Sequence, residues 1–323
     1  MQCTARVLIA LGTLLAAQFV CAQGFPAKPV RMVTEFVAGS GGDALLRIVA
    51  AGMSTHLGQS VVIENRAGAG GVVAAEAVAR SAPDGYTLFG ATPNTQVIRV
   101  HLARSNPFDP AKDFTPITTL GEPTIVIVAH PAFAANNVKE LVELARRDPG
   151  KYSYATSGIG STHHLSGEQL KMLTGINLVH VPYKALNDAL RDVVSGTIPI
   201  AFNLSAPAAP MVKAGKLKVL AIVNPNRFAP WPEVMTLGEQ IPGFEQAPSW
   251  TGLLGPANLP VAVLRRIHDD TIKAMNDPEV KAKINAAGFN ALGNTPEEFA
   301  ALIKRQTDLV GRIVKSAGIQ PTE

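Results

Sequence analysis

Residues 30–91 read VRMVTEFVAGSGGDALLRIVAAGMSTHLGQSVVIENRAGAGGVVAAEAVARSAPDGYTLFGA. Short apolar runs at 30–36, 60–64 and 87–91 predict strands, and two stretches with helical apolar spacing lie between them. Gly58 follows the first of these stretches, as glycine often does where a helix ends. Because parallel strands need a crossover that usually contains a helix, this βαβαβ order predicts a parallel sheet covered by helices.

The same alternation of strands and helices restarts at residue 124. Strands are expected at 124–129, 153–156, 178–182, 198–203 and 218–223, helices at 138–147, 163–174 and 187–194, and a helical tail from 261 onward. Proline-containing breaks at 116–123 and 224–232 separate the two blocks. We therefore expect an α/β protein of two lobes, each a mostly parallel sheet flanked by helices. Lobe one would comprise residues 23–118 plus 225–323 and lobe two residues 119–224, with a ligand cleft between them at the strand ends.

Length and composition agree with a two-domain globular protein. The chain has 323 residues, of which 47% are hydrophobic and 17% charged, so it is not a disordered chain. The formal net charge of +4 is not accompanied by a run of basic residues. We therefore expect no nucleic-acid partner.

The N-terminus has the pattern of a secretory signal. Arg6 precedes an apolar run at 7–20, which is shorter than a membrane span, and small residues follow around Cys21 and Ala22. We expect residues 1–22 to be a cleaved signal peptide and the mature chain to be periplasmic; a lipid anchor on Cys21 is the alternative. Both cysteines, Cys3 and Cys21, lie in this segment, so a mature chain would have no disulfide and no thiol nucleophile.

A glycine-rich loop follows the first predicted strand and leads into a helix. Its backbone amides could converge on a carboxylate, with the positive end of the helix dipole adding to the attraction. The candidate ligand-binding residues in this loop are Val37, Ala38, Gly39, Ser40, Gly41, Gly42 and Asp43. Two alternatives exist: a plain turn, and a dinucleotide fingerprint formed by the Gly39-x-Gly41-x-x-Ala44 spacing with Glu64 after the next strand. Asp43 argues against the fingerprint, because its carboxylate would face a pyrophosphate.

The second block contains a similar loop between the strand ending at 156 and the next helix. It supplies hydroxyls and glycine amides but no arginine, and its candidate ligand-binding residues are Thr156, Ser157, Gly158, Gly160 and Ser161. Two such loops facing each other could hold a small carboxylate. His164 and Glu168 have the i, i+4 spacing of a metal pair, but no third ligand is evident, and a solvated or cap-proximal pair is the favoured interpretation. Known catalytic motifs are missing, so we expect a binding protein rather than an enzyme, with no metal and no cofactor.

The sequence resembles the Bug receptors, the extracytoplasmic solute-binding proteins of tripartite tricarboxylate transporters. The resemblance runs in order along the mature chain, through FVAGSGGD at 36–43, LGQSVVIENRAGAGG at 57–71, PDGYTL at 83–88, FDPAKDF at 108–114, SGIGSTHHL at 157–165, HVPYK at 180–184, GKLKVLA at 215–221, WTG at 250–252 and DPEV at 277–280. It implies a two-lobed periplasmic-binding-protein fold that captures a small carboxylate and delivers it to membrane permease subunits. We also expect a monomer.

The resemblance adds site residues and also shows three departures. By position it implies that His164, Thr92, Pro182 and Tyr183 face the cleft, together with Asn203 at a strand end. Glu35 stands where the family commonly has proline, Ala185 where glycine is usual, and Asn203 where aspartate is frequent. These departures bear on the choice of solute. A receptor that reports to a sensor kinase would have the same sequence pattern, and an exported nucleotide-dependent enzyme is a more distant alternative.

Overall fold

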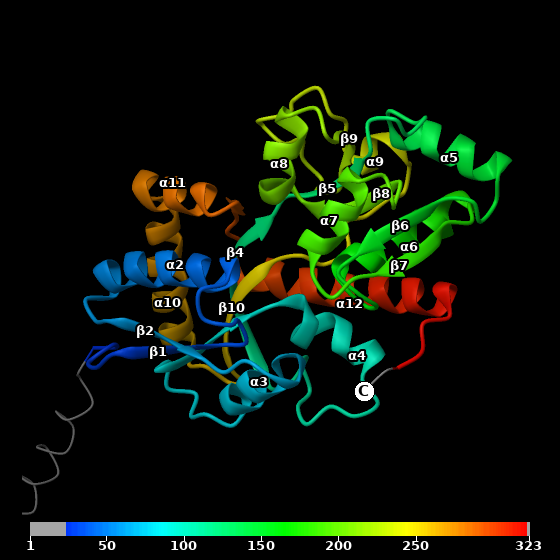
Figure 1. The fold of residues 1–323 in the computed structure, drawn as a ribbon. Helices are drawn as coiled ribbons and strands as arrows, with labels where there is room; N and C mark the ends of the chain where they lie inside the picture. Colours follow the sequence, from blue (N-terminus) through cyan, green and yellow to red (C-terminus); the bar gives the residue numbers. More distant parts are fainter. Residues whose placement is uncertain (1–23, 322–323) are drawn as a thin grey trace, which may run out of the picture.

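The computed structural model describes residues 24–321 and contains two β-sheets, each flanked by helices (Figure 1). The predicted α/β fold of two lobes is therefore confirmed. The predicted signal peptide, 1–22, lies outside the described residues. Among the described residues, no helix is both long enough and apolar enough to cross a membrane.

The first sheet has six strands in the order β11-β4-β10-β3-β1-β2. Its strands are β1 (Val30–Thr34), β2 (Val61–Asn65), β3 (Thr87–Ala91), β4 (Phe114–Pro123), β10 (Thr251–Pro256) and β11 (Phe289–Ala291). The helical segments of this part of the chain are α2 (Gly41–Leu57), η1 (Ala69–Gly71), α3 (Val72–Ala79), η2 (Asn94–Ile98), α4 (Arg99–Leu102), α10 (Val261–Asn276), α11 (Pro278–Ala286) and α12 (Pro296–Ala317). Apolar residues of α2, α10 and the strands form one buried core.

The second sheet has five strands in the order β7-β6-β8-β5-β9. Its strands are β5 (Ile125–Ala129), β6 (Ser153–Thr156), β7 (Val179–Pro182), β8 (Ile200–Leu204) and β9 (Lys218–Ile222). The helices around it are α5 (Val138–Arg147), α6 (Thr162–Thr174), α7 (Leu186–Val194), α8 (Ser205–Lys213) and α9 (Leu237–Gln240). A separate apolar core lies on each face of this sheet. Alternate residues of β5 belong to the two cores, so this strand is buried on both sides.

Both sheets are mixed, which corrects the prediction of mostly parallel sheets. β1 pairs in parallel with β2 and β3, but β10 runs antiparallel to both β3 and β4. In the second sheet, β6 is parallel to its neighbours and β5 is antiparallel to β8 and β9. The reason is the path of the chain: β4 leads directly into β5, and β10 brings the chain back to the first sheet. The βαβ rule covers only the strands that a helical crossover connects.

Residues 116–123 form most of β4 and are not a break between the two blocks. The expected lobe boundary after residue 118 falls within this strand, all of which belongs to the six-stranded sheet. The tail from 261 is helical except for β11, which pairs with β4.

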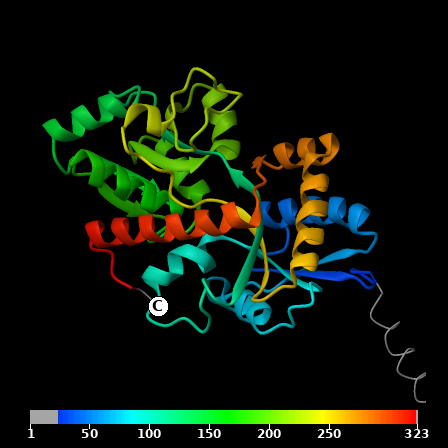
Figure 2. The same ribbon diagram turned by 180° about the vertical axis from the view of Figure 1, so that it is seen from behind.

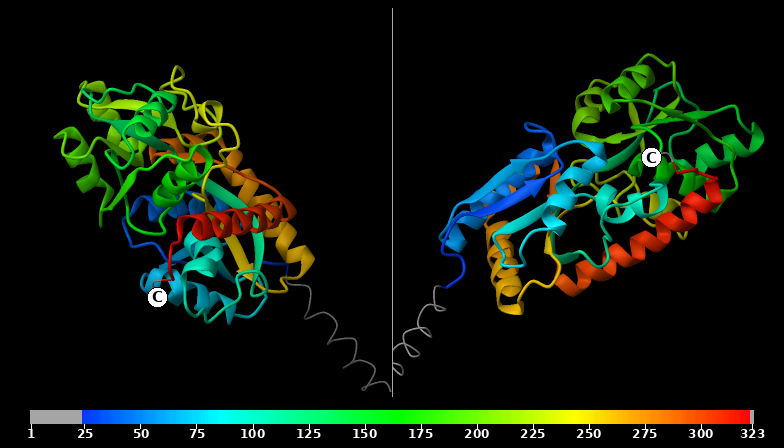
Figure 3. Two further views of the ribbon diagram at one scale, coloured as in Figure 1. Left: turned by 90° about the vertical axis from the view of Figure 1, so that its right-hand side faces the viewer. Right: turned by 90° about the horizontal axis from the view of Figure 1, so that it is seen from below.

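The long helix α12 connects the two halves of the molecule. It packs against β4 of the first sheet and against α6 beside the second sheet. Figures 2 and 3 show it running along one side of both lobes. Phe299, Leu309, Val310 and Ile313 are its buried residues. The capping box of Thr295 and Glu298 fixes where this helix begins.

Candidate functional site

A cavity of about 520 Å³ lies between the two sheets. The loops that follow β1, β3 and β6 and the segments around Trp250 and Phe289 supply its walls. Five of the residues predicted to bind a ligand line this cleft, namely Gly42, Thr92, Ser157, Gly160 and Ser161. The cleft thus brings together residues from both predicted loops. Leu102 of α4 lies against Gly160 of the second loop. A Cβ added to Gly160 would be only 2.5 Å from Cδ1 of Leu102.

The first loop uses part of its anion-binding capacity on its own carboxylate. The backbone N–H of Gly39 donates to Oδ2 of Asp43 at 2.8 Å, and the Ser40 hydroxyl caps α2 by accepting from the Asp43 amide. Arg47 and Asn65 also donate to the Asp43 carboxylate. Burial alone would raise the pKa of Asp43, but the hydrogen bonds from Arg47, Asn65 and the Gly39 amide lower it. Asp43 is therefore a buried carboxylate that fixes the loop, and it does not line the cleft.

Aromatic rings lie over the glycines at the start of α2. A Cβ on Gly42 would come within 2.2 Å of the Phe36 ring, and the nearest atom to a Cβ on Gly41 is in the Phe289 ring, at 3.7 Å. Phe36 and Phe289 both line the cleft. Gly42 is the only residue of the predicted 37–43 set that does so, among the residues the structure describes; Val37, Ala38 and Gly39 are exposed elsewhere on the loop.

Glu35 lies behind the wall formed by the loop after β3. Its Oε1 accepts the Thr92 amide at 2.8 Å and the Thr95 hydroxyl at 3.3 Å. Its Oε2 lies so near Gly71 that a Cβ there would come within 1.9 Å of it. Burial raises the pKa of Glu35 to about 7, and the hydrogen bonds from Thr92 and Thr95 oppose that shift. Glu35, which stands where the family commonly has proline, thus places a carboxyl group next to the cleft.

The second loop presents the start of α6 to the cleft. Ser161 is the N-cap of α6, and its hydroxyl accepts from the amide of His164. The amides of Thr162 and His163, the first two residues of the helix, have no intrahelical acceptor by helix geometry. Ser157 Oγ lies 2.9 Å from Nδ1 of His163, whose buried Nε2 has no hydrogen-bond partner among the described residues. Burial lowers the pKa of His163 to about 4, so the ring is neutral at pH 7.

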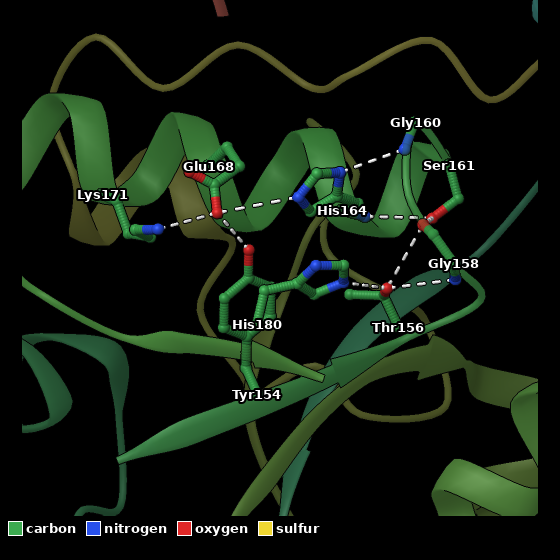
Figure 4. A network of polar contacts seen from close by, with 9 residues as sticks. All are labelled: Tyr154, Thr156, Gly158, Gly160, Ser161, His164, Glu168, Lys171 and His180. Atoms are coloured by element: carbon green, nitrogen blue, oxygen red, sulfur yellow. Dashed lines mark hydrogen bonds and ion pairs between the residues drawn. The ribbon is translucent and has the colours of Figure 1, made fainter. Parts of the chain in front are cut away.

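His164 supports the second loop from behind rather than lining the cleft (Figure 4). Its Nδ1 accepts the Gly160 amide at 3.0 Å, and its Nε2 lies 3.8 Å from Glu168. Glu168 also accepts from Tyr154 Oη at 2.6 Å and from Lys171 Nζ at 2.8 Å. Both His164 and Glu168 are buried, so the pair is not solvated; it is cap-proximal, the other form predicted, because the N-cap hydroxyl of Ser161 accepts the His164 amide. The described residues contain no cluster of three or more metal-ligating side chains.

A second histidine extends this network to Thr156. The His180 ring stacks on His164 with 3.9 Å between centroids, and its Nε2 lies 2.6 Å from Thr156 Oγ1. The Thr156 hydroxyl in turn accepts the amide of Gly158 at 3.2 Å. Burial lowers the pKa of both histidines, that of His180 to about 4. Two neutral rings can stack in this way without charge repulsion.

The remaining predicted residues make contacts within the second lobe. Tyr183 donates its hydroxyl to Asp192 at 2.6 Å, and the side chain of Asn203 bonds to the backbone of Leu186 and Leu204. Neither residue lines the cleft in this structure, and neither does Pro182. Asn203 is fully buried, and its side-chain amide links the end of β8 to the backbone at the start of α7.

The cleft also contains residues that the sequence did not single out. Arg99, Trp250, Phe289, Leu102 and Ile125 line it. Arg99 donates from Nε to Asn106 Oδ1 at 3.3 Å and from Nη2 to Ser105 O at 3.4 Å. These residues reach the site from distant segments. Only the WTG sequence around Trp250 belonged to the quoted resemblance, and nothing local marked the others.

The family model described as "Tripartite tricarboxylate transporter family receptor" matches residues 45–319. The chain belongs to this receptor family. A UPF0065 protein of Bordetella pertussis is a relative of this receptor, 31% identical over 318 residues, with 98% of each chain covered. The resemblance to the Bug family is therefore confirmed.

Two solved structures place this receptor among periplasmic binding proteins. A structure described as a periplasmic transporter is 38% identical, with a TM-score of 0.74, and the match covers 93% of this chain and all of that one. An R. palustris protein solved with adipate is 30% identical, with a TM-score of 0.75, and the match covers 92% of this chain and all of that one. Sequence and fold thus point to the same family.

Proposed function

We propose that this receptor captures a small carboxylate in the cleft between its lobes and delivers it to the permease subunits of a tripartite tricarboxylate-type transporter. The observation that carries the proposal is a cavity of about 520 Å³ at which a helix N-terminus from each lobe arrives, at Gly42 and at Ser161. Adipate in a relative of similar fold supports a carboxylate as the ligand class. The proposal includes a monomer that is exported to the periplasm after loss of residues 1–22.

The predicted site residues take two roles in this proposal. Residues that line the cleft would touch the solute: Gly42, Thr92, Ser157, Gly160 and Ser161. The others would hold the two loops in place or approach the solute when the lobes close: Val37, Ala38, Gly39, Ser40, Gly41, Asp43, Thr156, Gly158, His164, Pro182, Tyr183 and Asn203. Closure would bring the lobe of the six-stranded sheet toward the lobe of the five-stranded sheet, with the link between β4 and β5 and the segment before β10 as the connections.

A nucleotide-dependent enzyme is disfavoured by the first loop. The Asp43 carboxylate takes the Gly39 amide that a pyrophosphate would need, and it remains ionised at neutral pH because its pKa is lowered. A pyrophosphate there would meet a buried negative charge. The family is described as a receptor family, which agrees with binding and release of an unchanged solute.

Ligand carried through purification tests the proposal directly. Mature protein from the periplasm is analysed by native mass spectrometry, stripped by unfolding and refolding, and titrated with adipate, hexanoate, hexanamide and NAD by calorimetry. A bound carboxylate, or binding of at least one acid with weaker binding of the amide, is expected. Binding of NAD alone, or of the amide as tightly as the acid, would refute the carboxylate receptor.

A further inference from the structure

We propose that the solute is a monocarboxylate with a sizeable apolar body, whose carboxylate binds the amides of the second loop (residues 157–162) and whose body lies against Phe36, Phe289 and Ile159. This inference rests on the proposed function and narrows it to one class of ligand. The two sides of the cleft would then have separate tasks: neutral donors on one side and aromatic surface on the other.

The first-lobe side of the cleft offers aromatic surface where the sequence predicted amides. The Phe36 ring lies on Gly42 and Phe289 lies near Gly41, so both rings stand at the N-terminus of α2. The Gly39 amide already donates to Asp43. The rings are half-buried, and covering their remaining surface with an apolar group would be favourable.

The second-lobe side offers the donors for a carboxylate. Ser157 and Ser161 line the cleft, but the Ser161 hydroxyl already donates to Gly158 O at 2.7 Å, so the donors left at this loop are the amides of Thr162 and His163 at the start of α6. The Thr162 hydroxyl donates to Pro248 O, so this residue contributes its amide rather than its side chain. The His163 ring also lines the cleft and is held there by the Ser157 hydroxyl, 2.9 Å from its Nδ1. A carboxylate oxygen can satisfy several such groups together.

Ile159 places an apolar side chain directly beside these donors. It lies at the tip of the second loop, lines the cleft and is 59% exposed. An exposed isoleucine between two anion-binding residues contributes nothing to the binding of a small polar acid. It would be covered by the body of an apolar acid, and Leu102, which lies against the neighbouring Gly160, adds apolar surface to the cleft.

The charges of the cleft match one carboxylate better than two. Of the described residues that line it, Arg99 alone carries an ionised side chain, and this guanidinium donates to Asn106 and Ser105 of its own lobe. Glu35 lies behind the Thr92 wall and would repel a second acid group whenever it is ionised. One cation balances one carboxylate, so a second carboxylate would be desolvated without a second charge to balance it.

Hexanoate and adipate test the inference, because they share a six-carbon chain and differ by one terminal carboxylate. Calorimetric titrations at pH 7.5 would compare them with acetate, benzoate and succinate on the stripped mature protein. We expect hexanoate or benzoate to bind at least about tenfold more tightly than acetate, succinate and adipate. Succinate or adipate binding as tightly as hexanoate would overturn this inference and leave a carboxylate receptor. No binding of any acid would overturn the proposed function itself.

Two exposed residues provide a matched pair of variants that keep the fold. Ile159→Ser is expected to weaken hexanoate about fivefold or more and to leave acetate unchanged, because it removes apolar contact and no donor. Val261→Ser changes an equally exposed residue, 62% accessible, on α10 away from the cleft and should leave both affinities unchanged. If Ile159→Ser leaves hexanoate unaffected, the apolar body does not lie against the second loop and the inference is wrong.

Discussion

The backbone N–H of Gly39 donates a 2.8 Å hydrogen bond to the carboxylate of Asp43, four residues later at the start of α2. This bond places a permanent anion where the glycine-rich loop would otherwise offer an amide to a ligand. Arg47 and Asn65 complete the surroundings of the same carboxylate. These hydrogen bonds tie the loop to the start of α2 and to the end of β2.

Replacing Asp43 by asparagine should lower stability. The variant keeps the shape but loses the charge to which three donors point, so we expect a loss of about 1–3 kcal/mol at pH 7 by urea unfolding. Because the folded-state pKa of Asp43 is lowered, this contribution is present above the unfolded-chain value of about 4 and is lost as the pH falls below it. The difference between the wild-type and variant curves should therefore shrink progressively as the pH falls below about 4. The exposed Asp308→Asn serves as control and should change little at either pH; equal effects of both variants would contradict this role of Asp43.

Glu35 should give stability the opposite dependence on pH. The folded protein keeps the Glu35 proton up to about pH 7, whereas the unfolded chain releases it near 4.5, so stability should fall as the pH rises between these values. Glu35→Gln keeps an acceptor for the Thr92 amide and has no charge to bury. We expect it to match wild type near pH 4 and to exceed it at pH 8 by up to about 3 kcal/mol. Glu233→Gln, at an exposed loop position, is the control. A constant difference across pH 4–8 would show that the Glu35 carboxyl does not titrate in this window.

His164 should hold the second loop through the Gly160 amide. His164→Leu removes the acceptor of that amide and should cost about 1–3 kcal/mol of stability. Amide hydrogen exchange at Gly160 should accelerate in the same variant. His164→Asn, whose side-chain oxygen can take the place of Nδ1, should retain much of the protection. Equally fast exchange in both variants would mean that the ring acts by packing on His180 instead.

Solute binding should draw the lobes together. The cleft is lined from both lobes, so a bound solute favours the closed arrangement by the contacts that it makes only there. Small-angle scattering of the mature protein should show a smaller radius of gyration at saturating hexanoate than without it. An unchanged profile at saturation would contradict closure.

The local sequence pattern predicted all strands of the five-stranded sheet and β1, β2 and β3 of the six-stranded sheet, and it missed the other three strands of that sheet. β3 and β6 have the expected bounds, and Gly58 ends α2 in the left-handed conformation as predicted. β4, β10 and β11 were missed, because each is defined by antiparallel partners far away in the sequence. β4 also begins and ends near prolines, which read as a break. Pairing at such distances leaves no periodic signal in the strand itself.

The two loops that form the site were predictable from the sequence, but the groups that face the cleft were not. The sequence indicated which helices begin at the cleft through the two glycine-containing loops before them; in the structure Ser40 and Ser161 are the N-caps of these helices. It did not show that Asp43 and His164 would use the Gly39 and Gly160 amides, because those bonds depend on the direction of buried side chains. Nor did it bring Phe289 to the start of α2. That contact exists because β11 pairs with β4.

Gly42 should control the cleft through the Phe36 ring. An alanine Cβ at this position would come within 2.2 Å of that ring, so the ring must leave its place on α2 and turn into the cleft. Because the ring can swing away, we expect Gly42→Ala to change stability by less than about 1 kcal/mol, the scale of the alanine–glycine difference in a helix. The affinity of the Gly42→Ala variant for hexanoate should nevertheless fall about tenfold. The displaced phenyl ring would occupy the space of the ligand's apolar body and would no longer pack against that body. Phe36→Ala should also weaken hexanoate, and adding Gly42→Ala to it should bring no further loss, because the two changes act through one ring. The measurement is a double-mutant cycle by calorimetry with hexanoate, and additive losses would show that Gly42 acts on the solute independently of Phe36.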